Sequence, residues 1–240
     1  MSGGASRPPD LKADRARAFE LVTVSRETAE RLDRFVALLL DWQQRMNLIA
    51  PSTEGTIWTR HVADSLQLIR LAPGARVWVD LGSGGGFPGA VIACALMEVP
   101  GAHVHLVERS TKKAAFLREA IRATAVPATV HAMRIEDFVE NAPETFDVVT
   151  ARALAPLPEL LAMAYPLLKR GTLGLFPKGQ DVGSELTAAA KCWKLETNLS
   201  PSRTDPKGQI VVVRGIEPTS QKPRKKTRSS KPQIQKGRPR

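Results

Sequence analysis

The chain has 240 residues, 42% of them hydrophobic, and a formal net charge of +11, a composition that suits one large globular domain with appendages. No stretch approaches the roughly 18 consecutive apolar residues of a membrane helix, and the first residues lack the apolar segment of a secretory signal. The two cysteines, Cys94 and Cys192, are isolated and form no CxxC motif. Reduced thiols in a cytoplasmic protein are therefore expected.

The positive charge is concentrated at the end of the chain. Residues 218–240 contain nine of the 35 basic residues and no acidic one, so the other 217 residues carry a net charge of only +2. This segment is rich in Pro, Ser, Gln and Lys, and it is predicted to be a disordered polybasic tail. Such a tail can bind the phosphates of RNA, or it can simply be a solubilising extension.

The N-terminal part is predicted to be helical. Residues 1–21 are expected to be a flexible lead-in, and residues 22–72 a helical extension. Ser25 is a suitable N-cap for a first helix with apolar side chains at helical spacing. A second helix is predicted over 56–70, and the Pro-Gly turn at 73–74 marks a domain boundary.

Residues 73–217 alternate between strand-like and helix-like patterns. Strands are predicted over 76–80, 103–108, 128–132, 146–150, 171–176, 195–199 and 209–214. Helices are predicted over 88–97, 111–123, 157–168 and 184–191. This order predicts an α/β fold, with a mostly parallel seven-stranded sheet that has helices on both faces and ends in an antiparallel hairpin.

The first of these strands leads into a glycine-dense turn, VWVDLGSGGGFPG at 77–89. A glycine turn between a strand and a helix lets a ligand approach the backbone closely. Two cofactor fingerprints overlap here. Residues 84–89 match the G-x-G-x-x-G of dinucleotide sites. Asp80-x-Gly82-x-Gly84-x-Gly86 matches the acidic loop of methyltransferases that use S-adenosylmethionine.

Of the two acidic residues beside the turn, Asp80 favours S-adenosylmethionine. This cofactor has no phosphate but carries an ammonium group, which the carboxylate of Asp80 can bind. Glu108, at the end of the second strand, can accept the ribose hydroxyls that both cofactors present, so it does not choose between them. A nicotinamide-dependent oxidoreductase remains the alternative.

Several further segments make a resemblance specific. RMNLI at 45–49 and RHVADSL at 60–66 precede the glycine loop; RIE at 134–136, RA at 152–153 and PKG at 177–179 follow it. In this combination the chain resembles the bacterial small-subunit ribosomal RNA guanine-N7 methyltransferases, the RsmG family, also called glucose-inhibited division protein B. The resemblance covers about residues 25–215. It implies a Rossmann-like class I S-adenosylmethionine-dependent methyltransferase fold.

The resemblance also implies a reaction and a cofactor site. The methyl group goes from S-adenosylmethionine to N7 of a guanosine in the decoding region of 16S ribosomal RNA, and S-adenosylhomocysteine is the other product. The residues implied to hold the cofactor are Gly82, Phe87, Ile135, Glu136 and Arg152. Asp80 and Gly84 join this set from the loop pattern, and Glu108 stands where the ribose-binding acid is expected.

N7 of guanine has a free lone pair and needs no general base, so catalysis is expected to depend on positioning. Arg152 and Lys178 are the positioning candidates. The candidates for the RNA side are Arg45, Asn47, Arg60, His61 and Lys178. The partner is then small-subunit ribosomal RNA or the small ribosomal subunit, and a monomer is expected.

Two further expectations concern metals and turnover. His103 and His105 form an HxH pair without an evident third ligand, so no metal site is expected. A non-catalytic, S-adenosylmethionine-binding RNA-binding protein is the alternative of a different class.

Overall fold

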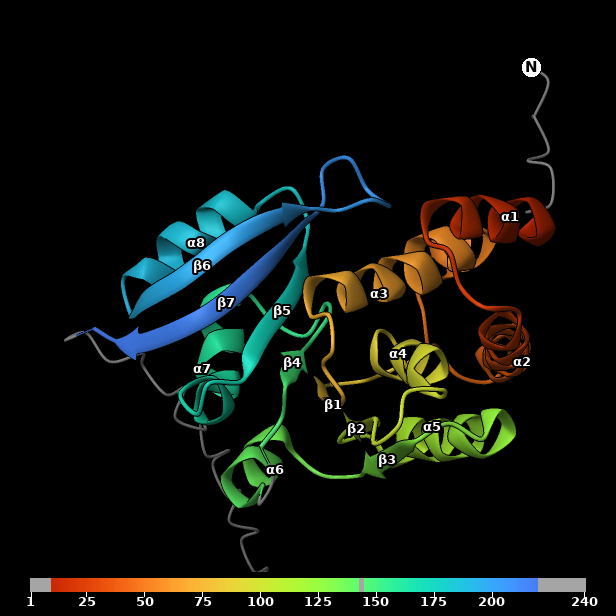
Figure 1. Ribbon diagram of the computed structural model, residues 1–240, viewed down its shortest axis with the longest axis horizontal. Coiled ribbons are helices and arrows are strands. Elements are labelled where there is room, and N and C mark those ends of the chain that lie inside the picture. The colour runs from red at the N-terminus through yellow and green to blue at the C-terminus, as the bar shows by residue number, and fades with distance from the viewer. Residues whose placement is uncertain (1–9, 143–144, 220–240) are drawn as a thin grey trace, which may run out of the picture.

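A seven-stranded sheet forms the centre of the computed structural model, which describes residues 10–142 and 145–219 (Figure 1). The strand order is β3-β2-β1-β4-β5-β7-β6. The strands are β1 (Val77–Leu81), β2 (His103–Val107), β3 (Ala128–His131), β4 (Val148–Thr150), β5 (Leu173–Lys178), β6 (Trp193–Pro201) and β7 (Gln209–Pro218). β1 to β5 are parallel, whereas β7 lies antiparallel between β5 and β6. The predicted sheet and its closing hairpin are therefore confirmed.

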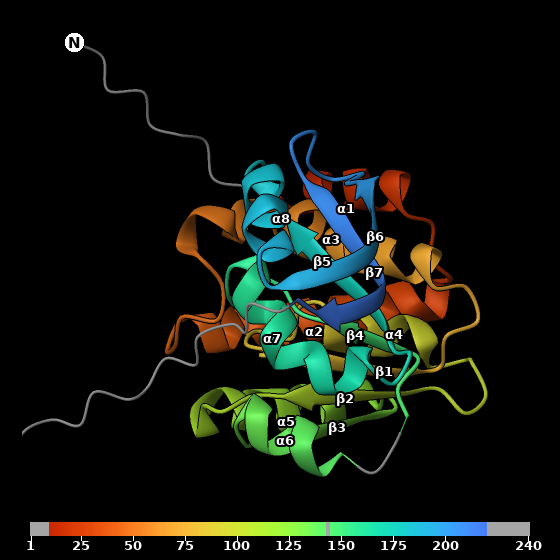
Figure 2. The same cartoon turned by 90° about the vertical axis from the view of Figure 1, so that its left-hand side faces the viewer.

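Helices cover both faces of the sheet. One face carries α4 (Gly89–Leu96), α5 (Thr111–Thr124) and the N-terminal α2 (Arg26–Gln43). The other carries α6 (Ile135–Asn141), α7 (Leu157–Leu168) and α8 (Val182–Ala190), which lie toward the viewer in Figure 2. Neighbouring side chains of a strand point to opposite faces, so Trp78 of β1 belongs to the first core and Val79 to the second.

The N-terminal helix α2 belongs to the same core as the sheet. Ser25 caps it by accepting a hydrogen bond of 3.1 Å from the Thr28 backbone N–H, as predicted. Its buried stripe includes Leu32, Phe35 and Leu39, which pack with α4 and α5. Because this core is continuous, the helices before the sheet are fixed in place over the glycine turn.

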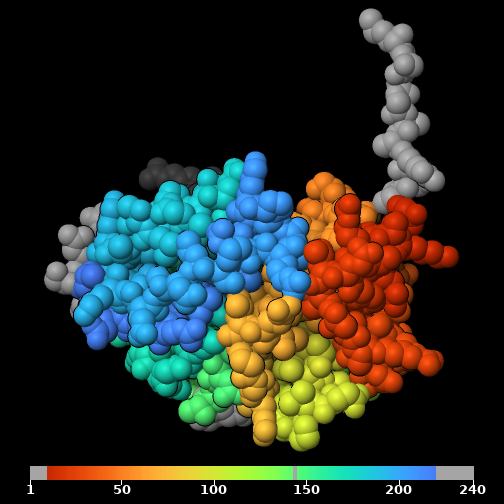
Figure 3. All heavy atoms as spheres, turned by 45° about the horizontal axis from the view of Figure 1, so that its top comes forward, coloured from red at the N-terminus to blue at the C-terminus, as the bar shows by residue number. Residues whose placement is uncertain are grey.

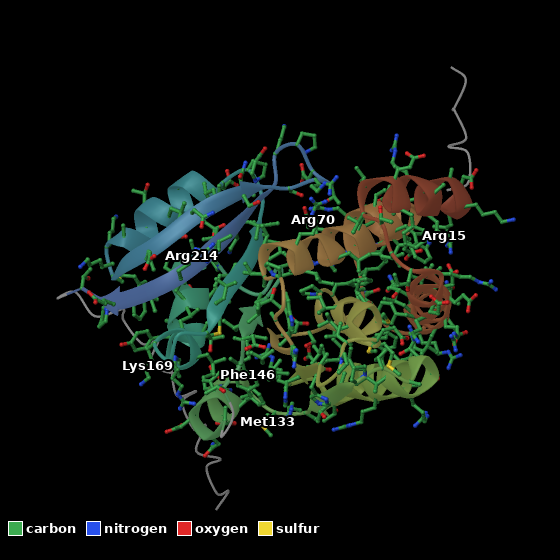
Figure 4. The ribbon with its side chains drawn as sticks, viewed as in Figure 1. Arg15, Arg70, Met133, Phe146, Lys169 and Arg214 are labelled. Atoms are coloured by element: carbon green, nitrogen blue, oxygen red, sulfur yellow. The ribbon has the colours of Figure 1, made fainter. Side chains whose placement is uncertain are left out.

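The expectation that residues 1–21 form a flexible lead-in is wrong for the part that the structure describes. Leu11–Leu21 form a helix, α1, capped by Asp10. Polar contacts hold it beside the buried Ala18: the buried carboxylate of Asp14 accepts hydrogen bonds from the Trp58 N–H at 2.8 Å and from the Thr59 hydroxyl at 2.6 Å. Arg15, labelled in Figure 4, forms an ion pair with Asp33 of α2 at 2.6 Å. A helix held by such contacts has little apolar periodicity, so its sequence gives little signal.

Two other elements differ from the prediction. The single helix expected over 56–70 is a continuous helical segment of mixed type, with a π-helical part (Trp58–Ala63), a short α-helical part, α3 (Asp64–Leu66), and a 3-10 part (Gln67–Leu71). A 3-10 turn (Pro51–Thr56) precedes it. The short helix α6 has no counterpart among the predicted helices.

Among the residues that the structure describes, no helix is both long and apolar enough to cross a membrane. The polybasic tail predicted for residues 218–240 lies, beyond Thr219, outside the described residues.

Candidate active site

The glycines of the turn after β1 serve close packing, border a cavity, or, in the case of Gly85, do both. A Cβ on Gly85 would lie 2.8 Å from the carbonyl oxygen of Leu48, and one on Gly89 would lie 2.7 Å from Cβ of Asp80. These two glycines allow close packing. Gly82 and Gly84 have positive φ angles of +74° and +54°, and both border the cavity. A Cβ on Gly84 would meet no atom closer than 3.7 Å, so the backbone is open to a ligand there, whereas at Gly82 the end of the Leu154 side chain lies 2.7 Å from where a Cβ would be.

Asp80 lies beneath this turn. Its side chain is fully buried, and Oδ2 accepts a hydrogen bond of 3.1 Å from the Gly89 N–H at the start of α4. Oδ1 has no hydrogen-bond partner within the described chain, and burial raises the pKa of the carboxyl to about 7. The structure thus places Asp80 behind the turn, where it positions α4, and not among the residues that line the cavity.

Replacing Asp80 by Asn should change how stability depends on pH. The raised pKa means that the folded protein keeps a proton between about pH 4 and 7 that the unfolded chain has released. Wild-type stability therefore decreases through this window because of Asp80, whereas Asp80→Asn has no such loss. We expect the free energy of unfolding of the variant, relative to that of the wild type, to increase by up to about 4 kcal/mol as pH rises from 4 to 8.

Urea unfolding of both proteins across this pH range measures the effect. The lowered pKa of His61 acts in the opposite direction, but both proteins contain His61, so its contribution cancels in the difference. Parallel stability curves for the two proteins would contradict the prediction.

Glu108 also supports the turn from below. Oε2 accepts a hydrogen bond of 3.0 Å from the Gly84 N–H, and Oε1 accepts one of 2.7 Å from the Ser110 N–H. The residue is 7% exposed. Both carboxylate oxygens are therefore bonded to backbone, one of them directly to the loop that was predicted to bind the cofactor.

Ile135 and Glu136 lie at the start of α6, apart from the main cavity. Glu136 is exposed, pairs with Arg134 at 3.2 Å, and borders a separate hollow of about 390 Å³ between α6 and α7. Ile135 packs against the core on that face. The structure does not bring these two residues together with Gly82 and Arg152.

The main cavity has a volume of about 720 Å³ and lies at the carboxyl ends of β1, β4 and β5. Ligands of open α/β sheets bind at this edge. The predicted site residues that border the cavity are Gly82, Gly84, Phe87, Arg152, Arg60, His61 and Lys178. The glycine turn and most of the predicted cationic side chains therefore share one space.

Arg152, after β4, is the centre of a hydrogen-bonded cluster in this cavity. Its guanidinium donates to the Arg60 carbonyl at 3.1 Å, to Asp64 Oδ2 at 3.3 Å and to His61 Nδ1 at 2.6 Å. It also lies over the ring of Phe87, 5.1 Å from the ring centroid. Arg152 thus joins the glycine turn to the helical segment that contains RHVADSL.

His61 is held neutral in this cluster. Because arginine can only donate, Nδ1 of His61 must accept, so the ring proton lies on Nε2, which donates to the Thr53 hydroxyl at 2.8 Å. Burial, with the neighbouring charges of Arg152 and Arg60, lowers the pKa of His61 to about 3. The ring also packs on Phe87, with centroids 4.9 Å apart. His61 is therefore part of the cavity wall and not a titrating base at neutral pH.

The loop between β6 and β7 closes the cavity from the C-terminal side. Thr204 donates to Asp64 Oδ1 at 2.8 Å, the Arg203 N–H donates to Gln67 at 2.8 Å, and Asp205 pairs with Arg60 at 3.2 Å. In Figure 3 this hairpin, in blue, lies against the orange N-terminal segment. The prediction missed the loop because no local pattern in residues 202–208 indicates contacts with a segment about 140 residues earlier.

Lys178 and Glu185 form the opposite wall. Lys178 Nζ, whose side chain is 10% exposed, donates to the Ala155 carbonyl at 2.8 Å and to Glu185 Oε2 at 2.7 Å. The same carboxylate oxygen accepts from the Leu157 N–H. Glu185 borders the cavity, and the prediction did not include it.

Arg45 and Asn47 are exposed and, where the structure places them, outside the cavity. Arg45, just after the end of α2, pairs with Asp41 of that helix at 2.9 Å. The residues just after them, Leu48 to Ala50, do border the cavity. In the described ranges, no group of three or more His, Cys, Asp or Glu side chains is arranged to hold a metal ion.

Sequence comparison places the chain among known proteins. A family model described as rRNA small subunit methyltransferase G (GidB) matches residues 28–207. The ribosomal RNA small subunit methyltransferase G of Bradyrhizobium sp. strain BTAi1 is 61% identical over 207 residues, which are 86% of this chain and 93% of that protein. The protein of the same description from Rhodopseudomonas palustris strain BisB18 is 56% identical over 214 residues, 89% of this chain and 92% of its own.

Solved structures show the same fold at low sequence identity. A putative O-methyltransferase from Klebsiella pneumoniae has a TM-score of 0.55 and 14% identity, and the match covers 85% of this chain and 96% of that one. An O-methyltransferase from Bacillus cereus in complex with S-adenosylhomocysteine has a TM-score of 0.55 and 17% identity, covering 84% and 96%. The class I methyltransferase fold is thereby confirmed.

Proposed function

Because the chain belongs to the family of ribosomal RNA small subunit methyltransferases G, and is thus an S-adenosylmethionine-dependent methyltransferase of 16S ribosomal RNA, we propose that its target is guanine N7 in the decoding region. The reaction takes place in the cavity at the carboxyl edge of the sheet. The observation that supports this most is the common space that Gly82 and Gly84 share with Arg60, Arg152 and Lys178. Family membership also resolves the two overlapping glycine fingerprints in favour of S-adenosylmethionine over a nicotinamide cofactor.

The residues of the cavity suit this cofactor. A Cβ on Gly84 would meet nothing closer than the Gly82 carbonyl oxygen at 3.7 Å, so the turn leaves open space where an adenosyl group needs to approach. Among the described contacts, Arg152 uses three of its five N–H groups, which leaves donors for the carboxylate of the cofactor's amino-acid end. Asp80 and Glu108 act indirectly in this proposal, by fixing the turn from behind.

The remaining residues position the guanine. The bound cofactor supplies a methyl group on a sulfonium. The N7 lone pair forms the new N–C bond, the electron pair of the broken S–C bond stays on sulfur, and no proton has to leave. A neutral His61, with both ring nitrogens already hydrogen-bonded, fits a reaction without a general base. Orientation of two bound reactants can supply roughly 7–11 kcal/mol of the barrier reduction.

The RNA is proposed to approach over the N-terminal helices and the β6–β7 loop. Arg60 is half exposed at the rim of the cavity, and Arg45 and Asn47 lie on the surface next to the segment that borders it. In this arrangement residues 22–72 form the substrate side and residues 73–217 the methyltransferase domain. A monomer acting in the cytoplasm is part of the same proposal.

The experiment that tests the proposal is transfer of a tritiated methyl group from S-adenosylmethionine to small subunits or 16S RNA that lack the modification. We expect label at N7 of one guanosine in the decoding region, and nuclease mapping identifies the labelled nucleotide. Binding of the cofactor without transfer would favour the alternative of a non-catalytic RNA-binding protein. Label on another atom or another RNA would contradict the proposed target.

Deletion of residues 220–240 should weaken RNA binding and make it less dependent on salt. The segment contains nine basic residues and no acidic one. If these residues contact phosphates, each contact adds about 0.7–0.9 to the slope of log K against log salt. Filter binding of RNA between 50 and 300 mM salt would measure this. An unchanged slope would show that the tail does not contact the RNA.

A further inference from the structure

Glu185 borders the cavity on the side of β5 and α8, two strands away from the glycine turn. It belongs to α8, and its partner Lys178 is the last residue of β5. Two strand spacings, or about 10 Å, separate the ends of β1 and β5, with the residues that follow β4 between them. A base whose reacting edge faces Gly82 and Gly84 therefore presents its other edge to Glu185.

Glu185 has a carboxylate oxygen to offer. Oε2 accepts from Lys178 Nζ and from the Leu157 N–H, but within the described residues no donor is bonded to Oε1. The side chain is 24% exposed and borders the cavity. Two hydrogen bonds therefore fix the position of the side chain through Oε2, and neither of them uses Oε1.

The other carboxylates that border the cavity are already engaged. Asp64 accepts from Arg152, Gln67 and Thr204. Asp205 accepts from Arg60 with Oδ2 and from the Lys207 N–H with Oδ1. Among these three carboxylates, Glu185 is the one with an oxygen to which no donor of the described residues is bonded.

Guanine presents complementary groups on its two edges. N7 and O6, on the Hoogsteen edge, are acceptors, whereas the Watson–Crick edge offers the donors N1–H and N2–H₂. A carboxylate binds two such donors, and adenine, which has an acceptor at N1, does not supply them. A pocket that methylates N7 can thus select guanine with a carboxylate on the side away from the methyl donor.

We propose that Glu185 is this guanine-selecting residue, with Oε1 accepting hydrogen bonds from N1–H and N2–H₂ of the target base. The inference rests on the proposed methylation of guanine N7 and specifies how the base is chosen. The methylated purine carries a positive charge, which makes N1–H a stronger donor. The contact therefore strengthens as the methyl group is transferred, and it favours the transition state over the bound substrate.

Lys178 is a positioning residue in this scheme. Its ammonium holds Oε2 and the Ala155 carbonyl, so it sets the direction of Glu185. The ion pair is neutral overall, which allows the carboxylate to remain ionised in a partly buried place without an unpaired charge.

The test compares Glu185→Gln with the wild type on three substrates. Small subunits are reconstituted with RNA that carries guanosine, inosine or 7-deazaguanosine at the nucleotide mapped in the methyl-transfer experiment. Inosine lacks N2–H₂ but keeps N7. For the wild type we expect kcat/KM to fall by about 10- to 100-fold from guanosine to inosine, because a hydrogen bond to a charged group is lost.

Glu185→Gln should remove most of this difference. The amide oxygen of Gln can still accept from Lys178 and Leu157, but its NH₂ group cannot accept from guanine. We expect the variant to lose about 10- to 100-fold on guanosine, less on inosine, and to bind S-adenosylhomocysteine with unchanged affinity. Glu140→Gln, at an exposed position on α6, is the matched control and should behave as the wild type.

The possible outcomes are distinct. Equal losses on guanosine and inosine in Glu185→Gln would assign the residue a purely structural role and overturn the inference. The inference would also be overturned if the wild-type enzyme methylated guanosine and inosine substrates at the same rate. Methylation of 7-deazaguanosine would instead show that N7 is not the acceptor, which would overturn the proposed function itself.

Discussion

Gly82→Val is expected to abolish cofactor binding while the protein remains folded. Gly82 borders the cavity with a φ angle of +74°, and a Cβ there would point 2.7 Å from Cδ1 of Leu154. The end of a leucine side chain can move aside, so the clash itself is cheap. The added methyl groups would occupy the place where the cofactor approaches the backbone. We expect at least about 100-fold weaker binding of S-adenosylhomocysteine by calorimetry, or roughly 2.7 kcal/mol.

Gly74→Val is the matched control for the backbone strain. Gly74 has a φ angle of +84°, and a Cβ there would meet nothing within 4 Å. Both variants therefore carry the cost of a β-branched residue at positive φ, about 1–2 kcal/mol or more. Only Gly82→Val should lose the cofactor. Similar affinities in the two variants would show that Gly82 is not part of the cofactor site.

The second large effect is expected for Arg152→Met, which should lose both stability and activity. The substitution keeps much of the side-chain volume but removes the donors to His61, Asp64 and the Arg60 carbonyl. Asp64 is only 8% exposed, and its charge would lose its cationic partner. Breaking a buried ion pair in this way costs about 3–5 kcal/mol, which denaturant unfolding can measure.

A double variant separates the two roles of Arg152. Adding Asp64→Asn to Arg152→Met removes the unpaired charge, so part of the stability should return. Methyl transfer should stay at least about 100-fold below that of the wild type, since the donors that hold the cofactor are still missing. Recovery of activity together with stability would mean that Arg152 acts only through the fold.

The sequence predicts the parts of this protein that depend on local patterns. Apolar patterns and turn residues allowed all seven strands to be located, with ends shifted by a few residues, and the pattern is clearest in the buried strands β1, β2 and β4. Helices α2, α4, α5 and α7 carry apolar side chains at helical spacing and were located for the same reason. The glycine turn was recognised because its conformation requires glycine.

The arrangement of the site could not be predicted in the same way. Arg152 contacts His61 across 91 positions of sequence, and Thr204 contacts Asp64 across 140, so no local pattern predicts these pairs. The acidic residues show a second limit. A carboxylate at the end of a strand can bind a ligand or cap the next helix, and Asp80 does the latter with the Gly89 N–H. Composition and spacing are the same in both cases, and only the packing of α4 distinguishes them.

The order of strands at the end of the sheet has a consequence for the synthesis of the protein. β7 lies between β5 and β6, so β6 has no place in the sheet until the later strand has formed. The loop that carries Thr204 and Asp205 to the N-terminal helical segment is set by the same hairpin. A growing chain on the ribosome therefore contains the whole glycine turn long before the β6–β7 loop can close the cavity. Methylation by this enzyme must wait until the last strand has left the exit tunnel.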